Sequence, residues 1–98
     1  MYHIPNQSSI HRLKMNSTSI SIANSLKHEL KKLEVCYKIK EKGHSFITEA
    51  ERCKLDEKGN RRRVDVVDID TGEEFEIEVD KRRASRFKDD KKVTVIMV

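Results

Sequence analysis

The sequence has little cysteine, proline, glycine or aromatic residue, and it lacks a long apolar run. Among 98 residues there are two cysteines, one proline and three glycines, and 5% are aromatic. Cys36 and Cys53 are too few for a disulfide framework and have no metal-ligand spacing, so we expect reduced thiols in an intracellular protein, in its own or a host cytoplasm. The scattered histidines argue against a zinc site. No run approaches the roughly 20 apolar residues of a bilayer span, which argues against a membrane protein.

The chain is short and densely charged. A core of this size cannot be divided, so we expect a single domain. Lys plus Arg number 21 against 17 Asp plus Glu, and the formal net charge is +4. The excess favours an anionic partner, of which nucleic acid is the commonest. Dense ion pairing in a thermostable protein would give similar totals.

The N-terminal part of the sequence divides into a leader and a helix. Residues 1–18 are polar, contain the only proline and show no period, so we interpret them as a flexible leader before a domain of residues 19–98. A helical pattern runs from about Ser19 to Lys42, and Gly43 should end it in a left-handed conformation. One stripe of apolar residues recurs at spacings of three and four and is expected to be buried: Ile22, Leu26, Leu30, Leu33 and Tyr37.

The rest of the sequence predicts a sheet. A strand begins at Phe46, a second reads "RVDVVDID", and a third, "EFEIEVD", alternates as a strand half-buried on one side does. "KRRASRFKDD" could hold a short helix, and "KVTVIMV" is typical of a central or parallel strand buried on both faces. We therefore expect an α+β, sandwich-like fold: a helix, a three-stranded antiparallel meander, a short helix and a final strand that joins the sheet.

The second and third predicted strands carry acids that should share one face. If the hairpin loop holds an even number of residues, either Thr71-Gly72 or residues 70–73, then Asp65 lies directly across from Glu78, with about 5 Å between their β-carbons. A three-residue loop would place Asp65 in the apolar layer instead. The even loop is favoured because it keeps this charge out of that layer.

Neighbouring carboxylates repel each other unless a cation lies between them. A divalent metal requires such hard oxygen ligands, with positions left open for water and phosphate. We therefore interpret Asp65 and Glu78 as candidate ligands of Mg²⁺ or Mn²⁺. The alternative for Asp65 is an ion pair with Arg63 or Arg82. The remaining acids of this region would then be solvated residues of the outer face: Glu74, Glu76 and Asp80.

The predicted helix offers a further acid. Glu29 falls on the same side as Ile22, Leu26, Leu33 and Cys36, whereas a solvent-seeking glutamate should lie opposite. Such a residue is either held in an ion pair or directed at the metal. Glu34 lies at the other margin of the stripe.

These elements, with "RVDVV" and "EIEVDK" on adjacent strands, resemble the PD-(D/E)XK nuclease superfamily, the restriction-endonuclease-like fold, and in particular its small archaeal and viral resolvase-like members. The likeness covers residues from about 20 to 98. It implies a metal-dependent nuclease that acts on DNA phosphodiester bonds. Asp65 and Glu78 would bind the metal, the backbone carbonyl of Val79 would join them, and Glu29 would be the acid from the first helix.

The sequence departs from this family at position 80. The family has a lysine two residues after the glutamate, whereas this chain has Asp80, followed by Lys81 on the other face of a regular strand. A β-bulge could redirect Lys81, Lys27 or Lys40 could substitute, and Asp80 could enlarge the metal site. Otherwise the chain is a catalytically weak or inactive module that binds DNA or a protein.

Six arginines flank the acids and could hold a DNA backbone: Arg61, Arg62, Arg63, Arg82, Arg83 and Arg86. A solvated basic rim would give the same pattern. Few aromatics argue for duplex or branched DNA rather than for stacking on single strands. Cleavage of both strands would need two copies, so we consider a homodimer formed by the helix or by residues 93–98. A small protein-binding α+β domain without a nucleic-acid role is the remaining alternative.

Overall fold

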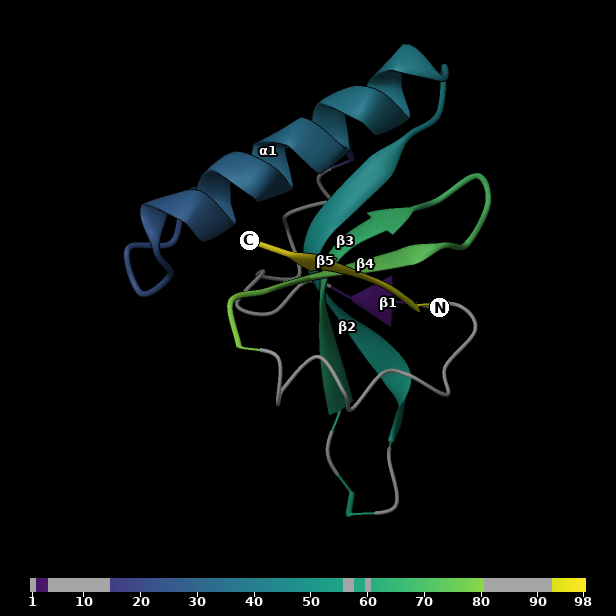
Figure 1. Cartoon of the computed structure of the whole chain (residues 1–98). Coiled ribbons are helices and arrows are strands. Elements are labelled where there is room, and N and C mark those ends of the chain that lie inside the picture. Colours follow the sequence, from purple (N-terminus) through teal and green to yellow (C-terminus); the bar gives the residue numbers. More distant parts are fainter. Residues whose placement is uncertain (1, 4–14, 56–57, 60, 81–92) are drawn as a thin grey trace.

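A computed structural model describes residues 2–3, 15–55, 58–59, 61–80 and 93–98 of the chain. Within them lie one helix, α1 (Leu26–Glu41), and five strands, β1 (Tyr2–His3), β2 (Phe46–Leu55), β3 (Arg61–Asp68), β4 (Glu74–Glu78) and β5 (Val93–Met97). The helix crosses one face of the sheet, so the fold is α+β (Figure 1). In this part of the chain no helix has both the length and the apolar character that crossing a membrane requires.

Local capping determines where α1 begins and ends. Ser25 is the N-cap, and its hydroxyl oxygen accepts a hydrogen bond from His28 N at 3.1 Å. The expected start at about Ser19 is therefore wrong by seven residues. Ile20 and Ile22 extend the apolar period toward the N-terminus, but the helix begins only after its N-cap, Ser25. Gly43 follows the helix with φ of +80°, which confirms the predicted stop.

The sheet is mixed, with strand order β1-β2-β3-β4-β5. The first three pairings are antiparallel and β4 pairs with β5 in parallel. The expected meander of β2 to β4 and the parallel direction of β5 are confirmed, but the sheet as a whole is not antiparallel. Among the described strands β5 forms an edge and is only partly buried, so the prediction of burial on both faces is wrong. The predicted helix at 81–90 lies outside the described residues.

Two segments of the expected leader contact β2. Tyr2 and His3 pair with Arg52 and Glu51 as strand β1. Asn16 N donates to the carbonyl oxygen of Phe46 at 2.8 Å, and Asn16 Oδ1 accepts from Phe46 N at 3.0 Å. Residues before position 19 therefore supply hydrogen bonds to one side of the sheet.

The β3–β4 turn is centred one residue earlier in the chain than either predicted loop. Asp68 N donates to Glu73 O at 2.9 Å, so the loop comprises residues 69–72. Gly72 takes φ of +78°, and its N–H donates to Asp68 O at 2.8 Å. The loop has four residues, and this even number preserves the facing of the two strands.

The register of β3 against β4 is shifted by two residues from the prediction. Val66 lies opposite Phe75; continued by one residue, this register sets Asp65 across from Glu76 rather than Glu78. Because the shift is even, Asp65 still shares a face with both glutamates. The shared face was predictable from alternation, but the partner depended on where the turn closes.

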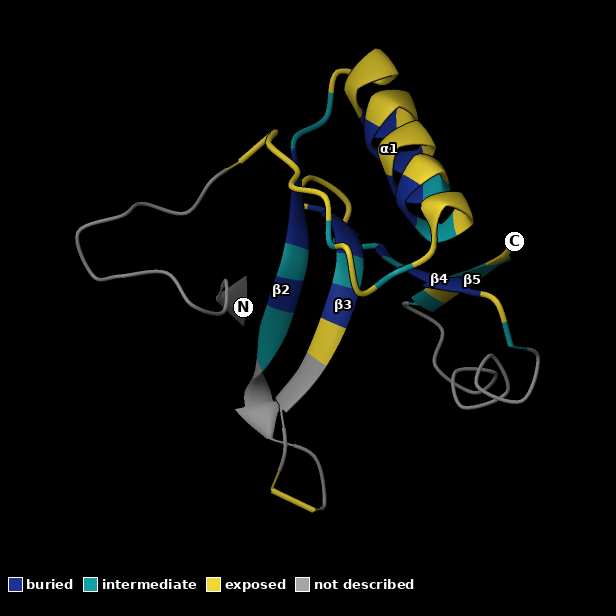
Figure 2. Ribbon diagram, turned by 90° about the vertical axis from the view of Figure 1, so that its left-hand side faces the viewer, coloured by how far each residue is buried: buried dark blue, intermediate teal, exposed yellow. Residues whose placement is uncertain are grey.

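The helix buries a different face from the one its sequence predicted. All five residues of the expected stripe are exposed, from 55% for Leu33 to 98% for Ile22. The apolar layer between α1 and the sheet instead consists of Val35, Cys36, Ile39, Phe46, Val66 and Ile77. A second small cluster contains Ile47, Ala50, Val64 and Val67. Figure 2 shows the buried side of α1 turned to the sheet and its exposed side turned away.

Candidate functional site

A pocket of about 420 Å³ opens beside β3, β4 and the N-terminal end of α1. It is lined by Ala23, Asn24, Ser25, His28, Arg63, Asp65, Glu76, Ile77, Glu78 and Val79. Both acids proposed as metal ligands are in this lining, together with Val79. The structure therefore brings Asp65 and Glu78 to one pocket, although they are not cross-strand partners.

Asp65 is anchored through one of its two oxygens. Its side chain is 14% exposed, and Oδ2 accepts a hydrogen bond from Ile77 N at 2.8 Å. The same oxygen lies 3.4 Å from His28 Nε2. Asp65 Oδ1 accepts no hydrogen bond from the part of the chain that is described. The alternative of an ion pair with Arg63 is not observed, and Arg82 lies outside the described residues.

Glu78 is held in a similar way at the end of β4. Its side chain is buried, and Oε1 accepts from Val79 N at 3.2 Å and from Asp80 N at 3.3 Å. Within the described ranges Oε2 has no hydrogen bond. Each of the two carboxylates thus has one oxygen fixed by backbone N–H groups and a second that remains available to a ligand.

His28 joins Asp65 to the helix and was missed by the sequence analysis. Its Nδ1 lies 2.9 Å from Glu29 Oε2, and its Nε2 faces Asp65. When Nδ1–H donates to Glu29, a neutral imidazole presents Nε2 as an acceptor, opposite an oxygen that is also an acceptor. A proton on Nε2, a bound water or a cation would make this contact favourable. The available signal was its position beside Glu29 in the first turn of α1.

Glu29 lies in a buried ion pair. Its Oε1 accepts from Lys32 Nζ at 3.0 Å and from Ser21 N. Burial alone would raise the pKa of Glu29, but the bonds from Ser21, His28 and Lys32 outweigh it and lower the pKa from its ordinary 4.5 to about 2. Of the two predicted alternatives, the ion pair is therefore correct, and Glu29 is an ionised carboxylate that orients His28.

Lys32 links Glu29 of α1 to Glu49 of β2. It is 2% exposed, and Nζ donates to Glu29, to Ser19 O at 2.9 Å and to Glu49 Oε1 at 3.0 Å. Its three protons thus have three acceptors. Burial alone would lower the pKa of Lys32, but the bonds to the two glutamates raise it. Glu49 reaches Lys32 from β2 with φ of +53°, a left-handed conformation that is uncommon for a residue with a side chain.

The acids of β4 are buried, contrary to the expected solvated outer face. Glu74 is 1% exposed. Arg52 of β2 reaches it across β3: Nε lies 3.1 and 2.9 Å from the two carboxylate oxygens, and Nη2 lies 2.5 Å from Oε1. Glu76 is also buried and lines the pocket. Strand alternation placed these acids on one face but could not show that the face is covered.

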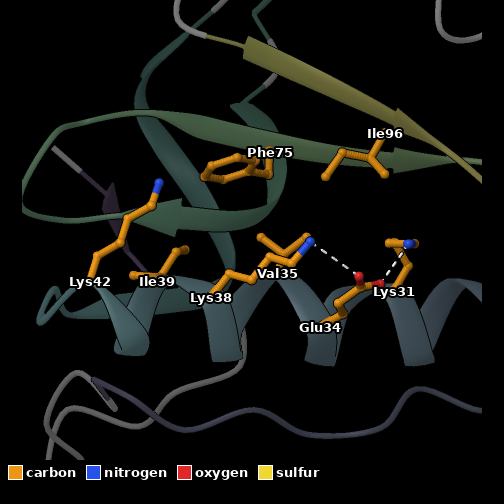
Figure 3. A pocket seen from close by; sticks show the side chains of 8 residues that line it. All are labelled: Lys31, Glu34, Val35, Lys38, Ile39, Lys42, Phe75 and Ile96. Atoms are coloured by element: carbon orange, nitrogen blue, oxygen red, sulfur yellow. Dashed lines mark hydrogen bonds and ion pairs between the residues drawn. The ribbon is translucent and has the colours of Figure 1, made fainter.

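Glu34 lies outside the pocket. It forms ion pairs on the surface of α1 with Lys31 at 2.6 Å and Lys38 at 3.3 Å. Hydrogen bonds from Lys31 and Lys38 lower the pKa of Glu34. Figure 3 shows these three side chains beside a smaller, largely apolar hollow between α1, β4 and β5. Glu34 is therefore a surface residue of the helix.

A second group of potential metal ligands lies at the β3–β4 turn. His44, Asp68 and Asp70 offer atoms within 4.8 Å of one another, and no other such trio occurs among the residues that the structure describes. His44 Nδ1 lies 2.8 Å from Asp68 Oδ2, Asp68 Oδ1 accepts from the backbone of Asp70 and Thr71, and Asp70 Oδ2 accepts from Ser45 N. Burial would raise the pKa of Asp68, but His44 and the backbone bonds lower it. We therefore assign to these three residues a structural role, in which their hydrogen bonds stabilise the β3–β4 turn.

Few of the predicted basic contacts can be placed. Arg63 lines the pocket with an exposed side chain, and its Nε lies 4.0 Å from Glu49 Oε2. Arg61 and Arg62 belong to β3, but their side chains lie outside the described part. The following predicted residues are wholly outside it: Lys81, Arg82, Arg83 and Arg86. Lys27 and Lys40 are exposed and Asp80 is half-buried, and all three are absent from the lining.

No protein-family model, no curated protein and no solved structure matches this chain. The likeness to PD-(D/E)XK nucleases therefore rests on the residues and the order of elements alone. What the structure establishes is an α+β fold with one pocket that contains Asp65, Glu78 and His28.

Proposed function

We propose that the chain is a divalent-metal-dependent phosphodiesterase of nuclease type that acts on DNA, with Asp65 and Glu78 as the metal ligands. One observation carries the proposal. The two carboxylates line the same pocket, and each keeps one oxygen in place through backbone N–H groups while the other accepts no hydrogen bond within the described ranges. This leaves two hard oxygen donors without a hydrogen-bond partner among the described residues, beside a cavity large enough for substrate phosphate.

The donor set fits Mg²⁺ or Mn²⁺. These ions are held by one or two carboxylates and complete their coordination with waters and phosphate oxygens, so a trio of protein ligands is not needed. Val79 also lines the pocket, and its backbone carbonyl would be a further oxygen ligand. When bound, the ion would polarise the scissile phosphate and lower the pKa of a coordinated water.

His28 supplies the basic group that Asp80 does not. Ionised Glu29 holds the Nδ1–H of the imidazole, which leaves Nε2 to accept a proton from a water in the pocket. Asp65, 3.4 Å from Nε2, would stabilise the imidazolium that forms. Among the described residues of the lining His28 and Arg63 carry the basic side chains, so we assign to His28 the role that a lysine would otherwise have.

Two features of the pocket favour a phosphate. The N-terminal end of α1 contributes Ala23, Asn24 and Ser25, and the partial positive charge of a helix N-terminus attracts anions. Arg63 adds a full positive charge on the opposite element. A helix, three antiparallel strands and a parallel strand are five of the six elements of the expected αβββαβ core, and the expected second helix lies outside the described residues.

A module that binds DNA without cutting it is the second candidate. The observation that favours it is that no lysine is among the described residues of the lining, together with Asp80 at the position of the family's lysine. Such a module would use Arg63 and the helix N-terminus in the same way but would not turn over its ligand.

The test is incubation of the full chain with plasmid and four-way-junction DNA in Mg²⁺ or Mn²⁺. We expect cleavage that Asp65→Ala and Glu78→Gln abolish and that His28→Gln reduces about 100-fold, as loss of a general base does. Glu41→Gln and His44→Gln are the matched controls, since Glu41 is exposed and His44 pairs with a carboxylate outside the pocket. Both should cleave normally.

The outcomes separate the candidates. Cleavage that survives Asp65→Ala would reject the metal assignment. Binding without cleavage in either metal would favour the module, and DNA retention should then collapse between low and moderate salt because phosphate contacts release counterions. No retention at low salt would reject both readings.

A further inference from the structure

The outward face of α1 and the segment before it form an apolar surface. We call this the outer stripe; it consists of Ile20, Ile22, Leu26, Leu30, Leu33 and Tyr37. Each of these residues is more than half exposed, and Figure 2 shows this side of α1 turned away from the sheet. A soluble protein rarely leaves an apolar patch of more than a few hundred Å² uncovered unless the patch binds a partner.

The spacing of the stripe fits another helix. Leu26, Leu30, Leu33 and Tyr37 are separated by four, three and four residues, which is the heptad seam of two packed helices. The residues of α1 that pack on the sheet lie outside this seam, on another side of the helix. The helix thus carries two separate packing faces, and the sheet occupies only one of them.

We propose that the occupant of the outer stripe is a second copy of this chain, with the two α1 helices antiparallel about a two-fold axis near the middle of the helix. In that arrangement Leu30 of one copy packs on Leu33 of the other, and Leu26 packs on Tyr37. Each contact occurs twice, as a self-complementary interface requires. This inference does not rest on the proposed function.

The two ends of the stripe have complementary shapes. A groove of about 350 Å³ lies at the N-terminal end, where its apolar lining includes Ile20, Ile22, Leu26 and Leu30. Tyr37 projects from the other end of α1 and is 66% exposed. The antiparallel arrangement delivers Tyr37 of each copy to the groove of the other. Tyrosine is one of the residues that most often dominates the energy of an interface.

Charge at the border of the stripe favours the same arrangement. Lys27 and Glu34 occupy equivalent heptad positions beside the seam, and antiparallel pairing sets Lys27 of one copy near Glu34 of the other. A parallel pair would place these two positions on opposite flanks of the seam and would not bring Lys27 to Glu34.

The area available is sufficient for a dimer. An aromatic side chain such as that of Tyr37 can bury about 150–250 Å², and together with five exposed leucines and isoleucines it offers several hundred Å² per copy. Two copies therefore approach the roughly 1,000 Å² that marks a specific interface.

The experiment measures mass by light scattering and sedimentation from low micromolar to submillimolar concentration. The wild-type chain should reach the mass of a dimer. Leu30→Glu with Leu33→Glu should remain a monomer with an unchanged circular dichroism spectrum, because both side chains are exposed within one copy. Ile69→Glu, an exposed apolar residue in the β3–β4 turn, is the matched control and should still dimerise.

Two further sets of variants test the geometry. Tyr37→Ala should weaken association more than about tenfold, whereas Tyr37→Phe should retain it. Lys27→Glu and Glu34→Lys should each weaken the dimer, and their combination should restore it. A wild-type chain that stays monomeric throughout, a dimer that survives the double Leu→Glu change, or charge reversals that do not compensate would overturn the proposal.

Discussion

The inner face of α1 buries Glu29 and Lys32, whereas its outer face exposes Leu30, Leu33 and Tyr37. The inner charges are tolerable because every proton of Lys32 has an acceptor and Glu29 is bonded to several donors. The outer side chains have no such compensation within one copy, and about 25 cal/mol per Å² of apolar area would be recovered by covering them. Which face of α1 is buried therefore depends on the hydrogen-bond and ion-pair partners available to its residues, and hydropathy alone does not predict it.

The largest effect should come from removing the buried ammonium. Lys32→Ala leaves Glu29 and Glu49 without their shared cation, and breaking a buried ion pair in this way costs about 3–5 kcal/mol. Urea unfolding monitored by circular dichroism measures the loss. Lys40→Ala, on the exposed side of the same helix, should change stability by no more than about 0.5 kcal/mol. Similar values for the two variants would mean that the inner network is not buried.

A second comparison uses the apolar residues of the two faces. Ile39→Ala should destabilise the fold by about 2–5 kcal/mol because it opens a cavity against Phe46 and the sheet. Leu33→Ala, measured at a concentration where the chain is monomeric, should cost under about 1 kcal/mol. Urea midpoints of both variants test this, and a reversed order would show that the stripe predicted from the sequence is the buried one after all.

The third comparison is the dependence of stability on pH. The pKa of Glu29 is about 2 in the folded chain and lies near 4.5 when the residue is unfolded, so its contribution is complete above about pH 4.5 and is lost as the pH falls toward 2. The thermal midpoint of the wild type should therefore fall more steeply through this window than that of Glu29→Gln. Glu41→Gln should follow the wild type, and parallel curves for all three would refute the assignment.

The smallest effect concerns the reactivity of thiols. Burial raises the pKa of Cys36 to about 11, so the folded chain should hold it as an inert thiol. In a Cys53→Ala background, iodoacetamide should modify Cys36 only after denaturation. A Leu33→Cys change in a background without Cys36 and Cys53 should be modified at once in dilute native protein, and protection that increases with concentration would sharpen the case for the dimer.

Much of the local structure could be predicted because it depends on neighbouring residues. Gly43 ends α1 as expected, and Asp65, Glu76 and Glu78 line one pocket. The identity of the partner of Asp65 was missed, because a turn that closes one residue earlier moves the register by two. Asp65 and Glu78 nevertheless line the same pocket, although they are not cross-strand partners.

His28 and Lys32 were missed because their roles depend on distant residues. Nothing near His28 in the sequence indicates Asp65, and nothing near Lys32 indicates Glu49. Periodicity ranked the faces of α1 by hydropathy, and the five apolar residues gave the stronger signal. A lysine that has three acceptors can be buried, so the face that contains it can pack on the sheet while the more apolar face stays exposed. Those acceptors come together only in the folded chain.

By itself the sequence determined that Gly43 ends α1 and that side chains alternate between the two faces of each strand, because caps and alternation act over a few residues. Only the tertiary structure decided which face of α1 meets the sheet and that Asp65, Glu78 and His28 line one pocket. The physical reason is that pairing across the fold sets the cost of burying a charge, and those pairs form between residues that lie far apart in the chain.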